Sequence, residues 1–456
     1  MPLATFAGDF RTPAKEPLLP LKTALAICSL ALPLFAQYDG PSILTRGQAP
    51  AAMQSPQVDL RPFVEINGVY DTGLTGVILT DQGQLANTSA AGVELTGGIS
   101  GVHSWKHTQV GLDYRGSLRH YDRQTFYDGT DQSLLLDVTH ELSRHVTLGL
   151  REDAGLFSGG FGPMGLYQSV PFDPSTMFTP TTDFFDNRTL YMSTQGALTW
   201  QKTARLSFNF SGNGFLVRRR SSALYGVTGS SAHGDLQYRL TRHTTVGAAY
   251  DFTEFNFLRI FGATDLHSFV GSYSVRLTRT VEFTGYGGIM HMETKFIHTV
   301  PVDPVIAALI GETQGNILVH TTSNLPTGSG RLSKTFPTGV AFISGGYTVV
   351  PGNGLFLTSK MATASVGYTY TGLRRWSFRA QADAFRGTSV GNVLGDYNNY
   401  DAGLTVSRRI SGIVNGLFSF NARKYSSPMF TLYNRVFYDA RIGLGFSPGD
   451  VPLRMW

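Results

Sequence analysis

Residues 108–120 read TQVGLDYRGSLRH, and the character of their side chains alternates along the stretch. In a β-strand successive side chains point to opposite faces, so alternation gives the two faces different chemistry. One face would carry Thr108, Val110, Leu112, Tyr114, Gly116 and Leu118, and the other would carry Gln109, Gly111, Asp113, Arg115, Ser117 and Arg119. The stretch therefore predicts a strand with one face for an apolar environment and one face for water.

Six short basic segments look like copies of one turn that joins such strands. They are LSRHVTL (142–148), WQKTARL (200–206), LTRHTTV (240–246), LTRTVEF (277–283), GLRRWSF (372–378) and VSRRISG (406–412). Short turns at one end of the strands and long loops at the other are typical of transmembrane β-barrels. We expect an all-β fold, a transmembrane antiparallel up-and-down β-barrel with short periplasmic turns and long extracellular loops.

Strand-like segments recur along most of the chain, and we count about sixteen. They lie at 59–70, 91–103, 107–120, 132–141, 145–156, 188–200, 204–217, 231–240, 244–255, 266–277, 280–293, 361–371, 375–386, 398–407, 412–423 and 434–446. An even count returns both ends of the chain to the same side of the membrane. Short and long connections alternate between these segments. Segment 336–350 could be a seventeenth strand, but it would break this alternation, so we assign it to a long loop at 294–360.

The composition agrees with a barrel rather than a set of soluble domains. Charged residues make up 15% of the 456 residues, whereas a soluble domain usually has about 25%. The net charge of +5 comes largely from the basic turns, and no segment has the 3.6-residue period of an amphipathic helix. We therefore expect a lipid-facing exterior and no nucleic-acid-binding surface.

The N-terminal segment has the pattern of a secretory signal. Lys15 and Lys22 precede an apolar run from Ala24 to Phe35, which is too short for a membrane-spanning helix of about 20 residues. We expect a signal peptide at 1–36, a periplasmic leader at 37–58 and the barrel at 59–456. Cys28 is the one cysteine and falls inside the signal, so the mature chain would contain no disulfide.

The face opposite the apolar one carries charges of both signs. Charged side chains in contact with hydrocarbon cost a few kcal/mol each, so we expect them to face a water-filled lumen. The predicted pore-lining residues are Asp113, Arg115, Arg119, Arg151, Arg239, Arg276, Arg379, Asp383 and Arg441. The alternative for any one of them is a structural Asp–Arg pair in the wall.

Tryptophan positions give a second indication of the topology. Trp105, Trp200 and Trp376 all lie in or beside short basic turns. Indole rings prefer the interface between membrane and water. We expect these three residues to form an interface belt at the turn end of the barrel.

The whole pattern resembles a Gram-negative outer-membrane porin. The resemblance covers about residues 59–446 and rests on alternation, not on a specific motif. The last segment, from Tyr438 to Phe446, is similar to the strand that ends such barrels and serves as their assembly signal, although this chain continues to Trp456. The resemblance implies location in the outer membrane, contact with its lipid and insertion by the outer-membrane assembly machinery; assembly into homo-oligomers is left open.

The third long loop, at 157–187, corresponds in position to the loop that narrows the pore in general porins. It is rich in aromatic residues, which would form an adhesive patch if they were exposed. We expect it to fold into the lumen as a constriction loop that contains Phe172, Asp173, Asp183 and Asp186. The alternatives are a cap over the outer mouth or a contact with a neighbouring subunit.

Two functions follow from these patterns. The first is a porin-like channel for passive diffusion of small polar solutes, with a lean toward anions. The alternative is a structural barrel, or one for export or assembly of surface polysaccharide, whose lumen is closed by loops. We find no catalytic constellation, metal site or phosphate-binding motif, and we expect no cofactor and no enzymatic activity.

Overall fold

The computed structural model describes residues 60–72, 89–122, 128–157, 189–220, 224–352, 357–370, 372–390, 396–428 and 436–447. The predicted signal peptide (1–36) and leader (37–58) lie outside these residues and stay predictions. The described elements are β1 (Arg61–Asp71), β2 (Ala90–Ser104), β3 (Thr108–Tyr121), β4 (Gly129–Ser143), β5 (Val146–Phe157), β6 (Thr189–Gln201), β7 (Leu206–Arg219), β8 (Gly226–Arg239), β9 (Thr244–Leu258), β10 (Gly262–Arg276), β11 (Val281–Pro301), α1 (Pro304–Ile310), β12 (Gln314–Phe336), β13 (Gly339–Pro351), β14 (Thr358–Tyr370), β15 (Trp376–Ser389), β16 (Asp396–Arg409), β17 (Val414–Ser426) and β18 (Val436–Phe446).

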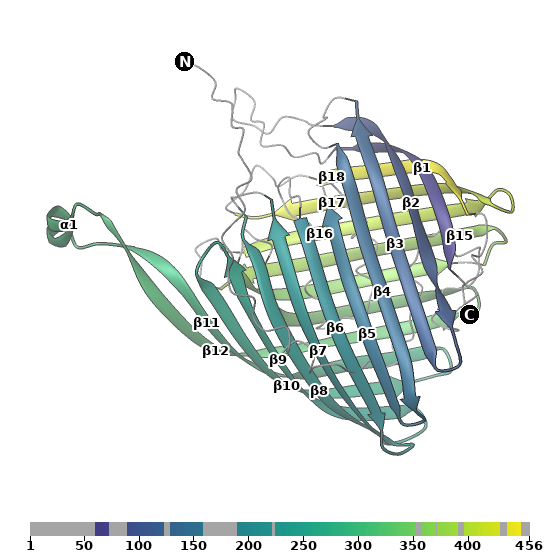
Figure 1. Cartoon of the computed structure of the whole chain (residues 1–456), viewed down its shortest axis with the longest axis horizontal. Helices are drawn as coiled ribbons and strands as arrows, with labels where there is room; N and C mark the ends of the chain where they lie inside the picture. The colour runs from purple at the N-terminus through teal and green to yellow at the C-terminus, as the bar shows by residue number, and fades with distance from the viewer. Residues whose placement is uncertain are drawn as a thin grey trace.

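These strands form one closed antiparallel barrel. Each strand pairs with its neighbours in sequence, and β1 closes the ring by pairing with β18 from Val64↔Phe446 to Asp71↔Asp439. In Figure 1, β3–β8 form the wall nearest the viewer and β15–β18 cross behind it. Closure leaves the barrel no free sheet edge along this seam, as a strand structure in a membrane requires.

The described barrel has 18 strands, so the prediction of about sixteen was wrong. All sixteen expected segments are strands, and the two additional ones, β12 and β13, lie in the segment 294–360 that we assigned to a loop. The sequence obscured β12 because its outward positions include Asn316, Thr322, Asn324 and Gly330 in place of large apolar residues. The parity rule was correct, since two added strands keep the number even.

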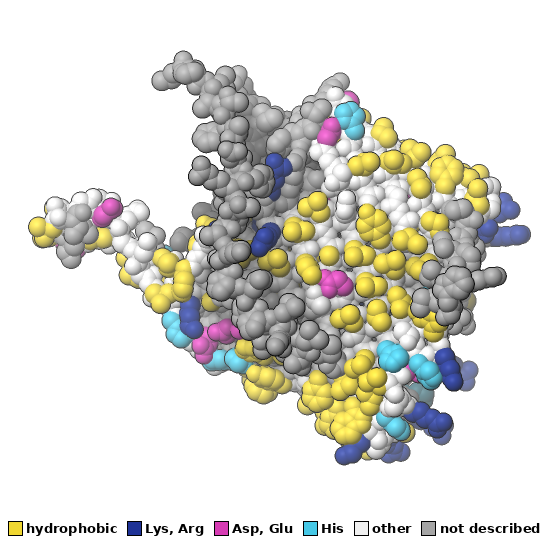
Figure 2. Space-filling view, in the orientation of Figure 1, with side chains coloured by type: hydrophobic (Ala, Val, Ile, Leu, Met, Phe, Trp, Pro, Cys, Tyr) yellow, Lys and Arg dark blue, Asp and Glu magenta, His cyan; other side chains and the backbone are white. Residues whose placement is uncertain are grey.

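Side-chain exposure follows the predicted alternation. On β3, the apolar Tyr114 and Leu118 are 39% and 57% exposed, whereas Arg119 on the opposite face is 6% exposed. Figure 2 shows hydrophobic side chains spread over the outer surface of the near wall, with Lys and Arg gathered at the end that carries the short turns. The six basic turns all join consecutive strands at this end, as predicted.

Glu152 of β5 is a carboxylate on the outer face of the barrel, among apolar neighbours. Glu152 lies opposite Leu136 of β4 and Thr194 of β6, and directly opposed residues share a face. The hydroxyl of Thr194 donates a hydrogen bond to Glu152 Oε2 at 2.6 Å. This bond offsets part of the cost of a carboxylate on a surface that is otherwise apolar.

The hairpin β11–β12 extends past the barrel as an arm. β10 pairs with β11 only as far as Gly262↔Phe296, and β13 pairs with β12 only from Gly328↔Tyr347 onward. The two arm strands continue to pair with each other as far as Pro301↔Gln314, and α1 forms the tip. Figure 1 shows the arm leaving the barrel on the side away from the short turns.

Two adjacent glycines in β11 differ in the space around them, which gives a test of the packing between strands. A Cβ on Gly288 would overlap the backbone carbonyl oxygen of Phe269, whereas a Cβ on Gly287 would have nothing within 4 Å. We expect Gly288→Ala to lower the free energy of unfolding by about 1–3 kcal/mol, the usual cost of overpacking. Urea unfolding in detergent should give Gly287→Ala a free energy of unfolding close to that of the parent protein. Equal losses of this free energy in both variants would contradict the packing.

Candidate functional site

The inner wall of the barrel carries most of the predicted site residues, and its largest charge cluster spans the closure seam. Arg119 of β3 contacts Glu94 of β2 at 2.8 Å and Asp131 of β4 at 3.1 Å. Arg441 of β18 reaches across β1 to the other oxygen of Glu94 at 3.1 Å and also contacts Asp439 at 3.1 Å. Glu94 is therefore shared by two guanidinium groups. The side chain of Arg119 is only 3% exposed.

Asp113 and Arg115 form a separate pair on β3. They are two residues apart on one face of the strand, and Arg115 Nη2 lies 3.2 Å from Asp113 Oδ2. The guanidinium of Arg115 also lies over the ring of Phe63, 6.0 Å from its centroid. The side chains of Arg115 and Asp113 keep some contact with solvent, with exposed fractions of 16% and 18%.

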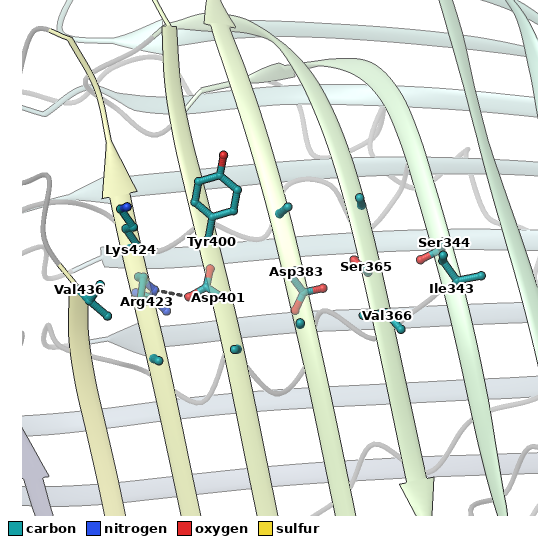
Figure 3. A pocket seen from close by; sticks show the side chains of 15 residues that line it. Ile343, Ser344, Ser365, Val366, Asp383, Tyr400, Asp401, Arg423, Lys424 and Val436 are labelled. Carbon is teal, nitrogen blue, oxygen red and sulfur yellow. Dashed lines mark hydrogen bonds and ion pairs between the residues drawn. The ribbon is translucent and has the colours of Figure 1, made fainter.

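A second cluster lies across β15, β16 and β17, where register places Asp383 opposite Asp401 and Asp401 opposite Arg423. Arg423 Nε donates to Asp401 Oδ1, as the dashed line in Figure 3 marks. Gln381 donates to Asp383 at 2.8 Å, and Asn399 donates to Asp401 at 2.7 Å. The list of predicted site residues lacked Arg423, which ends one of the expected strands and would have been found by continuing the alternation.

A third cluster, on β7–β9, contains a histidine that the sequence did not single out. His233 lies between Asp235, at 3.0 Å, and Asp251, which also bonds to its ring. Asn209 donates to the other oxygen of Asp235 at 2.7 Å. The sequence did offer a signal for this cluster: His233 and Asp235 are two residues apart, which places them on the same face of a strand.

The remaining predicted arginines are spread over the wall. Arg239 and Arg276 are the last residues of β8 and β10 and are exposed at the turn end. Arg151 lies within β5 opposite Asp137, and Arg379 lies within β15 opposite Thr369 and Thr405. The structure therefore brings Arg119 and Arg441 together through Glu94 and leaves these four apart. That any of them lines a pore stays a prediction.

The predicted constriction loop, with Phe172, Asp173, Asp183 and Asp186, lies outside the described residues. The three tryptophans lie at the turn end of the barrel: Trp105 follows β2, Trp200 belongs to β6 and Trp376 begins β15. Lys202 lies 6.0 Å from the ring of Trp200, and the guanidinium of Arg408 lies 5.0 Å from the ring of Trp376. Their role as a membrane-interface belt stays a prediction.

An apolar cluster inside the barrel was not foreseen. It gathers inward-facing residues of β6–β11 and β13 toward the loop end, together with Leu357 just before β14, and its members are 0–8% exposed. They include Tyr191, Phe215, Val217, Val227, Phe255, Phe257, Leu266, Met290, Met292, Val349 and Leu357. The inner wall thus has charged clusters on β15–β18, on β1–β4 and on β7–β9, and an apolar cluster toward the loop ends of β6–β11.

A hollow of about 540 Å³ lies along β13–β18. Figure 3 shows its lining from these neighbouring strands. Most of the lining residues belong to the outward alternation, including Ala364, Ala382, Ala402 and Ala422, with Lys424 toward the loop end. The hollow is therefore a depression of the outer wall rather than part of the lumen.

The described residues contain no group of three or more His, Cys, Asp or Glu side chains arranged to hold a metal ion. They also contain no helix that is both long enough and apolar enough to cross a membrane, a finding that does not concern strands.

No model of a known protein family and no curated protein matches the sequence. Solved structures do resemble the barrel. They include a BenF-like porin from Pseudomonas fluorescens Pf-5 (11% identity, 86% of this chain and 98% of that chain, TM-score 0.43) and OccK5 (OpdH) from Pseudomonas aeruginosa (13% identity, 85% and 98%, TM-score 0.39). OccAB3 from Acinetobacter baumannii is similar at 9% identity, with 85% and 99% covered and a TM-score of 0.40. At this level of similarity the description of the fold rests on the strand pairing of this chain.

Proposed function

We propose that this chain is an outer-membrane channel for passive diffusion of small polar solutes. The observation that carries the proposal is a closed ring of 18 described strands with mostly apolar side chains on its outer face and clusters of charged side chains on its inner face. Barrels of 16–18 strands are wide enough to leave an aqueous path that side chains alone do not fill. In this proposal the outer membrane supplies the lipid, its assembly machinery inserts the barrel, and no enzymatic reaction or cofactor is involved.

The proposed lean toward anions depends on a few arginines rather than on the whole wall. Arg119 and Arg441 share Glu94 and have further carboxylate partners, so much of their positive field is neutralised locally. Arg151 and Arg379 lie within strands on the inner face, Arg151 opposite Asp137 and Arg379 opposite Thr369 and Thr405. We propose that these two side chains bias the lumen toward anions, because fixed wall charges select among permeating ions.

The alternative function, a structural or polysaccharide-export barrel with a closed lumen, has one observation in its favour. The apolar cluster on β6–β11 and β13 is almost fully buried inside the barrel. Apolar residues that are shielded from water do not line a water-filled path, so this part of the inner wall would not belong to a channel. The channel proposal therefore places the solute path beside the charged side chains of the wall rather than beside this apolar cluster.

Single-channel recording with the purified protein in planar bilayers decides between the two. We expect discrete conductance steps that scale with salt concentration. A folded, heat-modifiable protein that gives no steps would support the closed barrel. Deletion of 163–180 within the predicted constriction loop should raise the conductance if that loop narrows the path.

Replacement of both proposed selectivity residues, Arg151→Gln with Arg379→Gln, should shift ion preference toward cations. The reversal potential across a salt gradient measures this, and the shift should fade near 1 M salt, where the screening length is about 3 Å. Arg205→Gln with Arg242→Gln, in the β6–β7 and β8–β9 turns, is the matched control, because it removes the same two charges at the rim. An equal shift in the control would show that the wall residues do not set the preference.

A further inference from the structure

The hollow on the outer wall arises because small side chains occupy neighbouring positions on four strands. The register of β14–β17 brings together five outward-facing alanines, three of them at one level and two one step nearer the loop end: Ala382, Ala402 and Ala422, and Ala364 and Ala384. Larger side chains stand at both edges, where Ile343 of β13 and Val436 of β18 are 58% and 41% exposed (Figure 3). The five methyl groups therefore form the floor of a groove that opens away from the lumen.

The groove lies at a level where the outer face is apolar. Leu404 and Phe420 lie opposite each other one step nearer the turn end than Ala402 and Ala422, and Leu404 is 39% exposed. In a membrane this level of the wall contacts hydrocarbon. The hollow of about 540 Å³ falls within the usual size of ligand sites, roughly 300–1,000 Å³. Lipid chains that pass over such a groove lose contacts with its floor, so a chain that enters it is favoured.

A cation stands at the loop end of the groove. Lys424 is two residues beyond Ala422 on β17 and lies opposite Tyr400 of β16, and both side chains are exposed (Figure 3). Among the described residues, no carboxylate forms an ion pair with the ammonium group of Lys424. Arg386, another outward-facing cation at this end, differs because Asp396 pairs with it at 3.0 Å. Lys424 therefore supplies a positive charge that an anionic group can neutralise.

We propose that the groove binds one anionic lipid molecule, with a hydrocarbon chain on the alanine floor and the charged headgroup at Lys424. The apolar floor and the cation follow one another along β17 in the order in which a lipid carries its chain and its headgroup. Adjacent levels of outward side chains are about 7 Å apart along a strand, so the headgroup lies just beyond the chain. Lys and Tyr side chains also favour the interface between hydrocarbon and water. The proposal rests on the membrane location of the barrel and is independent of whether its lumen is open.

Native mass spectrometry of the purified protein in detergent measures lipid binding directly. The two probes are phosphatidylglycerol, which is anionic, and phosphatidylcholine with the same chains, which is zwitterionic. The first phosphatidylglycerol molecule should bind about fivefold more tightly than phosphatidylcholine, which is the effect of one cation on an anionic lipid. Lys424→Gln should remove this preference, and Lys424→Arg should keep it. Lys295→Gln is the matched control, because Lys295 is a cation on the outward alternation of β11, opposite His320 and away from the groove.

Filling the groove tests the site of the hydrocarbon chain. Ala402→Phe should weaken the binding of both lipids by about tenfold, as expected when about two chain methylene groups lose their contacts. Ala248→Phe adds the same side chain at an outward position of β9, opposite Leu236 and Gly271, and should leave lipid binding unchanged. Heat-modifiable migration on a gel shows whether each variant is folded, and the comparison of the two lipids on the parent protein needs no variant.

Three results would overturn the proposal: equal binding of the two lipids by the parent protein, a preference that persists in Lys424→Gln, or equal weakening by Ala402→Phe and Ala248→Phe. A dimer of the parent protein that is lost in Ala402→Phe would also overturn it, because a second copy would then cover the groove. Single-channel conductance of Lys424→Gln should equal that of the parent protein, so a failure of lipid binding and a failure of the channel proposal are separate outcomes.

Discussion

Arg119→Met should destabilise the barrel by about 3–5 kcal/mol, the cost of leaving buried charges without their partner. The side chains of Arg119, Glu94 and Asp131 are 3–5% exposed, so water cannot replace the guanidinium. Of its two guanidinium partners Glu94 would keep Arg441, and Asp131 would lose an ion pair at 3.1 Å. Urea titration of the protein in lipid or detergent, followed by gel migration of folded and unfolded forms, measures the loss.

Arg115→Met on the same strand is the control for this variant. Its partner Asp113 is partly exposed, so solvent screens the charge that remains and the expected loss is about 1 kcal/mol or less. Adding Glu94→Gln and Asp131→Asn to Arg119→Met should recover part of the stability, since the uncompensated charges are removed together. If Arg119→Met costs no more than Arg115→Met, the cluster does not stabilise the wall.

The fold could be predicted from the sequence wherever lipid would contact a strand. Each of the sixteen expected strands places apolar residues at alternate positions, and each basic turn marks where a strand pair ends. β12 lacks this signal because its first half belongs to the arm, where no hydrocarbon selects apolar residues on one face. β13 was recognisable at 336–350 but was rejected because, without β12, it breaks the alternation of short and long connections.

The charge clusters could be predicted only as residues on a face, not as pairs. Arg441 and Glu94 are 347 residues apart and meet because β1 closes the ring between them. Contact between Arg119 and Glu94 depends on a register that alternation alone does not fix, since a shift by two residues preserves the pattern. The apolar cluster inside the barrel was missed for a related reason: alternation predicted a polar inner face along the full length of every strand.

The position of the arm makes the topology testable by an all-or-none result. A peptide tag inserted between Gly311 and Glu312 should be reachable by antibody on intact cells, because it lies after α1 at the tip of the arm. Gly311 ends α1 with φ of 75° and has open space around it, so an insertion there disturbs no strand. Gly328, within the segment expected to be an outer loop, is unsuitable because it pairs with both Gly287 and Tyr347 in the wall.

A tag beside Arg242, in the β8–β9 turn, should be unreachable on intact cells and reachable after the outer membrane is permeabilised. The physical reason is that short turns and long loops lie at opposite ends of a strand barrel, and the arm leaves from the loop end. Labelling at Arg242 but not at Gly311 on intact cells would show that the barrel has the opposite orientation. Labelling at both sites on intact cells would show that the chain does not separate two compartments, which would remove the basis for a channel.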